Sequence, residues 1–220
     1  GEILSTDAIF SLTIKKNVEI EAVFTKIPID TMVSYELPTG WNWFSINVKD
    51  ENLNNPVALL ESIKQSVVSV LGQEEDLVYD DQYGLYGSLT AFKPDRGYKV
   101  RVKEDVDFSL KGIPFAENEV TITLNKGWNW MGYTPNMEMS VNAALCNLMA
   151  EEGDIVMAQD QFATYDGAAW KGSLSVLAPG NAYLYYSGSV KSFNYPTGSS
   201  KMAIPMLSYR ASESYYFAKW

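Results

Sequence analysis

The chain has 220 residues, of which 46% are hydrophobic and 20% charged, values typical of a folded protein with one large or two modest domains. Its formal net charge of −10 argues against binding to nucleic acid or anionic lipid, because both need a concentrated basic surface. It has no histidine and a single cysteine, Cys146, which excludes histidine-based triads, histidine-liganded zinc and multi-cysteine metal sites.

The first thirty residues predict a β-hairpin. Apolar and polar residues alternate strictly over residues 9–14 and 18–24, on either side of a short polar connection. Because Glu2 follows a lone glycine and stands in what looks like the middle of a domain, we expect the chain to be an excised part of a longer protein. Residues 1–30 are then the truncated end of a preceding β module.

A tetrapeptide that occurs twice organises the rest of the chain. Residues 40–43 read Gly-Trp-Asn-Trp, and residues 127–130 repeat this sequence. In both copies an alternating segment precedes a short glycine-containing connection, and a second apolar segment follows it, a pattern that predicts a β-hairpin. The recurrence predicts two tandem homologous units, residues 31–116 and 117–196.

Each tetrapeptide is followed by a predicted helix. In the first unit Asn55 is a suitable N-cap and Pro56 suits the first helical position. Apolar residues at helical spacing then extend to Leu71, so we expect a helix that ends at Gly72. In the second unit Ser140 caps a shorter helix, with apolar side chains on one face.

The later parts of the two units also correspond. An Asp-Gln pair, a proline turn and closing strands follow each helix, so each unit reads β-β-α-β-β-β. The expected fold is α+β and strand-dominated, with an antiparallel sheet and one covering helix in each unit. The short link over residues 114–118 predicts units that pack together. Residues 197–220 form a tail that leads to a following module, with one further strand over residues 203–209.

Aromatic side chains are the first candidates for ligand contact. Trp41 and Trp43 share one strand face, as do Trp128 and Trp130, and two readings stay open. The favoured reading is structural, a strand buried on both faces that defines the repeat. The other is an exposed platform that stacks on sugar rings. A further candidate platform joins Trp170, in an inserted turn that we expect to be exposed, with Tyr185 and Tyr186.

Polar groups give weaker candidates. The Asp-Gln pairs are interpreted as structural turns that bond their own backbone, although they suit a polar ligand as well; they are Asp81 with Gln82 and Asp160 with Gln161. Three acidic groupings raise a calcium hypothesis, but none has the spacing of a known calcium loop. Cys146 is expected to be a small buried hydrophobe. No motif selects a catalytic carboxylate pair, so the sequence predicts neither an enzyme nor a cofactor.

Two known kinds of module resemble parts of this chain. Residues 5–24 resemble the closing strands of internalin-type B-repeats, which are extracellular β modules of bacterial surface proteins. Residues 31–196 are similar to the GWN-type repeat of large secreted or surface proteins, notably of Bacteroidetes. The similarity is carried by Gly-Trp-Asn at 40–42 and 127–129, the Asp-Gln pairs, and residues 170–174 and 177–180. The first copy departs from the pattern, since it has no counterpart of Trp170 and has Asp95 where the second has Gly180.

The resemblance implies location and a modular role. We expect a non-catalytic extracellular module of a bacterial cell-surface protein, active in adhesion or ligand display. A carbohydrate-binding module and a passive spacer are the alternatives. The expected partners are neighbouring domains of the same polypeptide and a glycan or host cell-surface protein, without membrane insertion. No stretch is as long and apolar as a membrane span.

Overall fold

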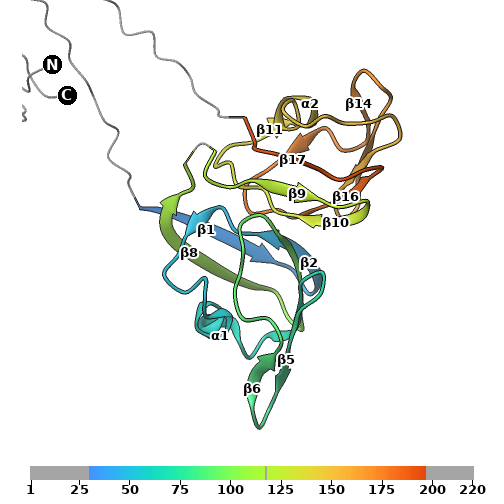
Figure 1. The fold of residues 1–220 in the computed structure, drawn as a ribbon. Coiled ribbons are helices and arrows are strands. Elements are labelled where there is room, and N and C mark those ends of the chain that lie inside the picture. Colours follow the sequence, from blue (N-terminus) through green and yellow to red (C-terminus); the bar gives the residue numbers. More distant parts are fainter. Residues whose placement is uncertain (1–29, 117, 197–220) are drawn as a thin grey trace, which may run out of the picture. The chain divides into compact units, whose positions relative to one another are not determined.

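The computed structural model describes residues 30–116 and 118–196, which belong to one compact unit. The described residues form antiparallel sheets and two short α-helices. The predicted strand-dominated architecture is therefore confirmed (Figure 1). The hairpin predicted over residues 9–24, the segment that resembles B-repeats and the strand predicted over residues 203–209 lie outside the described residues.

The first large sheet has five antiparallel strands in the order β2-β7-β4-β5-β6. Its strands are β2 (Gly40–Ser45), β7 (Gly97–Val102), β4 (Val67–Leu71), β5 (Asp76–Asp80) and β6 (Gly84–Gly87). The first Gly-Trp-Asn-Trp sequence begins β2, at the end of this order. Gly87 sits where an added Cβ would lie 2.2 Å from the Asp76 carbonyl oxygen, so this close strand approach requires glycine.

The second large sheet repeats this strand order with later parts of the chain, as β10-β16-β12-β13-β14. Its strands are β10 (Gly127–Met131), β16 (Tyr183–Ser187), β12 (Ile155–Met157), β13 (Phe162–Tyr165) and β14 (Trp170–Gly172). The second tetrapeptide occupies β10, the position that matches β2. Gly172 in β14 has the same constraint as Gly87, since its Cβ would lie 2.1 Å from the Phe162 carbonyl oxygen.

Smaller sheets cover the inner face of each large sheet. Their orders are β1-β8-β3, β17-β9 and β11-β15. Their strands are β1 (Thr31–Leu37), β8 (Val106–Pro114), β3 (Val48–Lys49), β9 (Ile122–Leu124), β17 (Lys191–Phe193), β11 (Met139–Ser140) and β15 (Val176–Leu177). The prediction of one helix covering each sheet is therefore incomplete, because small sheets supply much of the cover.

The predicted hairpins are wrong, although their strands exist. β1 pairs with β8 and β2 pairs with β7, so the two segments that flank the glycine belong to different sheets. A tight type I′ hairpin needs positive φ at both central residues. Pro38 cannot supply it, and in this connection only Gly40 has positive φ, at +107°. The connection is a corner between sheets. The Asn42 amide closes it by donating to the Pro38 carbonyl at 2.7 Å.

The same corner occurs before β10. There the Asn129 side chain donates to the Asn125 carbonyl at 2.8 Å and accepts from the Asn125 N–H at 2.7 Å. The asparagine of the tetrapeptide is thus a buried corner residue, 9% exposed in the first copy and 5% in the second. Its role explains why Asn stands between the two tryptophans.

The helices begin where the sequence predicts and end earlier. Asn55 accepts a hydrogen bond from the Ala58 N–H, and α1 (Pro56–Leu59) is followed by a 3-10 turn, η1 (Glu61–Ile63). The predicted continuation to Leu71 is wrong, because residues 67–71 form β4. β-Branched side chains dominate this segment and favour a strand. Ser140 caps α2 (Val141–Ala144) as expected.

Two hydrophobic cores fill the space between the layers. In the first, Phe44 is surrounded by aromatic rings, with centroid distances of 5.5 Å to Phe92 and 5.7 Å to Tyr98. In the second, Tyr133 packs edge-to-face on Tyr195 at 5.0 Å. Cys146 belongs to neither core. Its predicted burial is wrong, since the residue is exposed just after α2.

Candidate functional site: an aromatic face across two joined sheets

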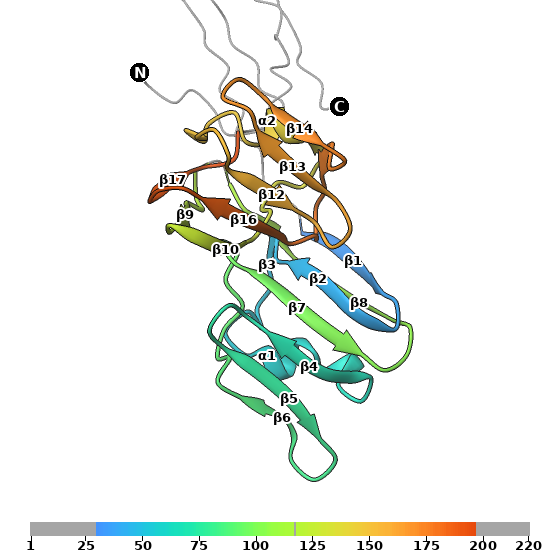
Figure 2. The ribbon, with the colours of Figure 1, turned by 90° about the vertical axis from the view of Figure 1, so that its right-hand side faces the viewer.

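The two large sheets are joined by backbone hydrogen bonds at the ends of β2 and β10. The Ser45 N–H donates to the Gly180 carbonyl at 2.8 Å, and the Gly132 N–H donates to the Asp95 carbonyl at 3.2 Å. Bridges between Phe44 and Asn181 and between Arg96 and Met131 complete the pattern. We call this junction the seam. Because each contact has a counterpart from the other sheet, the seam has approximate two-fold symmetry. Figure 2 shows β10 next to the beginning of β7, where the two sheets meet.

Ser45 and Gly132 occupy matching places in the seam but act differently. The Ser45 hydroxyl donates to the Asn181 carbonyl at 2.7 Å and accepts from the Tyr133 N–H at 3.1 Å. Gly132 has no room for a side chain, because its Cβ would lie 2.2 Å from the Pro94 carbonyl oxygen. Besides its two backbone hydrogen bonds, the seam therefore has one polar side chain, that of Ser45, and one close backbone approach, at Gly132.

Two glutamine side chains form hydrogen bonds with backbone groups at the edges of the tetrapeptide strands. Gln73, just after β4, donates to the Trp128 carbonyl at 3.1 Å and accepts from the Trp130 N–H at 2.9 Å. Gln159, just after β12, donates to the Trp41 carbonyl at 2.8 Å. Each glutamine thus reaches from one sheet to the tetrapeptide of the other. Sequence reasoning missed both, although each stands two residues after an apolar strand.

The Asp-Gln pairs do not occupy equivalent places. Asp81 and Gln82 lie in the turn between β5 and β6, where the Gln82 N–H donates to the Asp80 carboxylate at 2.8 Å. Asp160 and Gln161 lie between β12 and β13, where the Gln161 carbonyl accepts from the Ala158 N–H. All four side chains are exposed. Their resemblance in sequence does not reflect matched positions in the fold.

The tryptophans of both tetrapeptides lie on one outer face of the joined sheets. The Lys99 ammonium lies over the rings of both Trp43 and Trp130, at 4.5 and 4.2 Å from their centroids. In β2 the residues that alternate with the tryptophans, Asn42 and Phe44, are buried, so Trp41 and Trp43 point outward. The same alternation holds in β10. Both pairs therefore share the face that Lys99 occupies.

This outer face is uncovered at its two ends. Trp41 is 40% exposed and Trp128 is 45% exposed, while Trp43 and Trp130 are half-buried around Lys99. The prediction of a strand buried on both faces is therefore wrong for the outer tryptophans. Tyr186 lies beside Trp128, with ring centroids 5.4 Å apart. We call the surface of Trp41, Trp43, Lys99, Arg101, Trp128, Trp130, Leu184 and Tyr186 the aromatic face.

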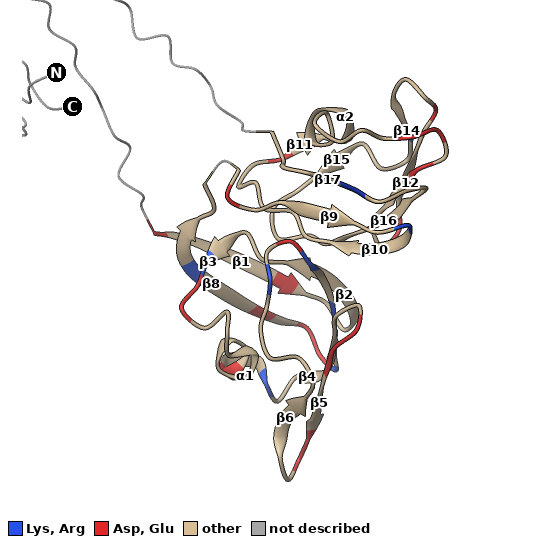
Figure 3. Ribbon diagram, viewed as in Figure 1, with Lys and Arg blue, Asp and Glu red and all other residues tan. Residues whose placement is uncertain are grey.

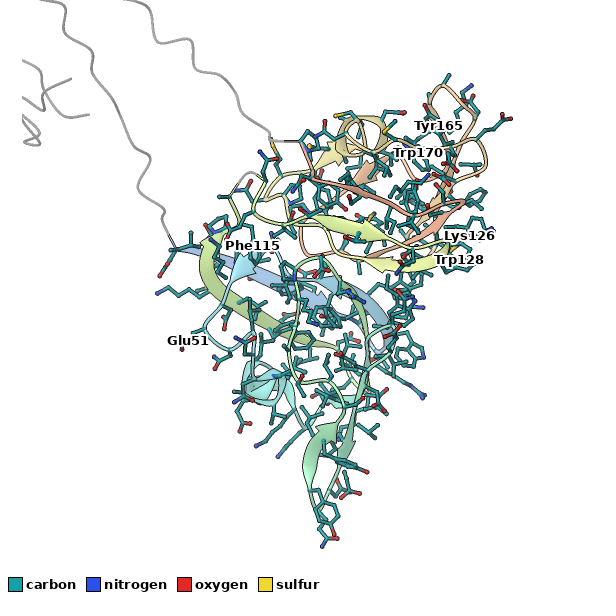
Figure 4. The ribbon with its side chains drawn as sticks, in the orientation of Figure 1. Glu51, Phe115, Lys126, Trp128, Tyr165 and Trp170 are labelled. Carbon is teal, nitrogen blue, oxygen red and sulfur yellow. The ribbon has the colours of Figure 1, made fainter. Side chains whose placement is uncertain are left out.

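Trp170 and Tyr185 lie elsewhere, and the expectation that Trp170 is exposed is wrong. Trp170 is 7% exposed, and its ring packs on Tyr165 at 5.3 Å and Tyr185 at 5.8 Å (Figure 4). Asn142 in α2 holds its backbone by accepting from the Trp170 N–H at 2.8 Å. Both aromatic rings belong to the second core. Of the three predicted contact residues, only Tyr186 is on an exposed surface.

The second half contains a buried charged cluster. The Asp154 carboxylate accepts hydrogen bonds from Lys191 Nζ and the Tyr185 hydroxyl, each at 2.7 Å. The N–H groups of Glu151 and Gly188 each donate to it at 3.0 Å. Burial opposes the charged form, but these four donors outweigh it and lower the pKa of Asp154. The same burial and the adjacent carboxylate raise the pKa of Tyr185.

The described residues contain no group of three or more acidic or thiol side chains suited to a metal ion. Within the same ranges, no helix is long and apolar enough to cross a membrane. Comparison of the chain with protein-family models, curated proteins and solved structures finds no match.

Proposed function

We propose that residues 31–116 and 117–196 are homologous units in tandem and form a non-catalytic extracellular module of a bacterial cell-surface protein. The matching strand orders of the two large sheets support the duplication. The paired contacts of the seam and the two glutamine bridges support it further. The role that we propose is adhesion or ligand display next to neighbouring domains of the same polypeptide.

The aromatic face is the observation that carries a binding role. Large aromatic side chains at the surface are typical anchors of recognition sites, because they bury much area with little loss of conformational entropy. Here Trp41, Trp128 and Tyr186 are each exposed by more than a third, on a rigid two-sheet support. A passive spacer, the third candidate function, would have no need of such a face.

Carbohydrate recognition is the second candidate, and the pairing of the tryptophans favours it. Two side chains two positions apart on a strand stand about 7 Å apart along one face. Flat indole faces at this spacing suit consecutive sugar rings, whose C–H groups pack on aromatic surfaces. A host protein is the other partner class that we consider.

The Trp41→Ala and Trp128→Ala variants test this proposal on a glycan array. For a glycan that the wild type binds, we expect each variant to lose about tenfold or more in affinity, because each removes an exposed anchor of the face. The matched control is Met149→Ala, which removes an apolar side chain that is 85% exposed outside the aromatic face. Equal binding by all four proteins would contradict a role for the aromatic face.

A further inference from the structure

We propose that the half of the aromatic face built by β2 and β7 binds acidic glycans, with a uronate-type ring stacked on the exposed Trp41 and the carboxylates held by β7 and its continuation. This inference rests on the proposed binding role of the face and adds a ligand class to it. It comes from a row of cationic side chains that runs beside Trp41 and Trp43.

The row is formed by alternate residues of β7 and its continuation. In the register of the sheet Trp43 is opposite Lys99 and Trp41 is opposite Arg101. Lys103 comes two residues after Arg101, where continued strand alternation assigns it to the same side, and its N–H donates to the Ser66 carbonyl at 2.9 Å. Adjacent strands lie about 4.8 Å apart, so the row runs parallel to the tryptophans within reach of one ring. Figure 3 colours the Lys and Arg positions of the described ribbon blue and the acidic positions red.

The cations of this row are available to a ligand. Within the described ranges, none of the three makes an ion pair with an acidic side chain. The nearest acidic residues along the chain are engaged elsewhere. Glu104 accepts from the Ser66 hydroxyl at 2.7 Å, and Asp105 accepts from both the backbone and the hydroxyl of Thr39. Three unpaired cations in a row are unusual in a chain with 17 basic and 27 acidic residues.

The second half of the face differs at the matching positions. Leu184 is opposite Trp130 and Tyr186 is opposite Trp128, where the first half has Lys99 and Arg101. The two ends of the face therefore share tryptophans and differ in charge. An anionic ligand is expected to prefer the first half, because guanidinium binds carboxylate in a bidentate manner and the indole rings accept the sugar face.

Lys99 has a narrower role than the other two cations. It is already sandwiched between Trp43 and Trp130, and burial lowers the pKa of its ammonium. It orders the central rings and adds positive potential to the face. Arg101, which is exposed, and Lys103, which is also exposed, supply the direct contacts to carboxylates.

The experiment compares two glycans that have the same sugar rings and differ in charge at the carboxyl group. Isothermal titration with oligogalacturonate and with its methyl-esterified form keeps the ring and removes the carboxylate charge. We expect the acid to bind at least tenfold more tightly at low ionic strength, with a preference that falls as salt is added. The double variant Arg101→Gln/Lys103→Gln is expected to abolish the preference, and Trp41→Ala to weaken both ligands. The double variant Lys111→Gln/Lys171→Gln is the charge-matched control, because it removes two cations that are 67% and 73% exposed outside the aromatic face, and it should bind like wild type.

Each other outcome overturns the inference in a distinct way. If oligogalacturonate and its methyl ester bind equally tightly, the aromatic face binds glycans without a preference for anionic ones. Tight binding of poly-glutamate that Trp41→Ala leaves unchanged would identify an acidic-peptide surface. If neither oligogalacturonate nor its methyl-esterified form binds, the proposal of a uronate ligand is overturned. The glycan array would still test the proposed function separately.

Discussion

Replacing Asp154 with alanine is expected to lower the free energy of unfolding by about 3–5 kcal/mol, because the buried Lys191 ammonium loses its partner at 2.7 Å and keeps the more distant Glu151 carboxylate at 3.8 Å. The side chain of Lys191 is 8% exposed and that of Asp154 is 1% exposed. The substitution also removes the acceptor of the Tyr185 hydroxyl, which is buried in the second core. Chemical denaturation of wild type and variant measures the difference.

Asp166 provides the matched control. Its carboxylate pairs with Lys171 at the surface and accepts from the N–H groups of Ala168 and Ala169. The Lys171 side chain is 73% exposed, so solvent screens this pair, and Asp166→Ala is expected to cost far less stability than Asp154→Ala. If the two substitutions cost the same, the buried cluster does not stabilise the second half in the way its geometry indicates.

Acidification gives a second readout of the same cluster. The pKa of Asp154 is lower in the folded chain than in the unfolded chain, where an aspartate titrates near 3.9. The stability it contributes is therefore fully present above that value and is lost as pH falls through the lower folded-state pKa. Between neutral pH and about pH 3, wild type is expected to lose more stability than Asp154→Asn does. If the free energies of unfolding of wild type and Asp154→Asn fall in parallel with pH, the pKa of Asp154 does not differ between the folded and unfolded chains.

Local signals in the sequence predict the local structure well. The cap residues Asn55 and Ser140 begin the helices. The alternating segment at residues 32–37 lies in strand β1, and the one at residues 120–124 contains strand β9. Strand partners are not local properties, and this is where prediction failed. β1 finds its partner in β8, far along the chain, because alternation states which face is buried and not which strand lies alongside. The spacing of apolar residues over residues 67–71 is compatible with both a helix and a strand. The segment forms a strand because β-branched valines favour that structure.

The candidate site shows the same limit. The tetrapeptides identify the two edge strands. The exposure of their tryptophans depends on the seam, and no local sequence pattern predicts the seam. Trp170 followed small residues and suggested an exposed turn. In the fold its strand runs beside α2, so the ring fills the second core. The glutamine bridges from Gln73 and Gln159 depend on the same long-range arrangement and had no motif of their own.

Replacing Phe44 with alanine is expected to destabilise the chain by about 3–5 kcal/mol, because it opens a cavity at the centre of the first core. Phe44 is 1% exposed and contacts the rings of Tyr35, Phe92, Tyr98 and Phe108. Phe162→Ala is the control, since that ring is 50% exposed on β13 and its loss should cost far less. Equal losses would contradict the placement of Phe44 at the centre of the core.

The position of Phe44 also tests whether the two sheets unfold together. It bridges Asn181 in the seam, and the next residue, Ser45, bonds to Gly180, Asn181 and Tyr133. A cavity beneath β2 should therefore weaken the seam, and the matched change Met131→Ala should do the same from the second core. We expect each variant to show one cooperative transition at lower denaturant concentration. Two separate transitions, with only one shifted in each variant, would show that the seam does not couple the cores.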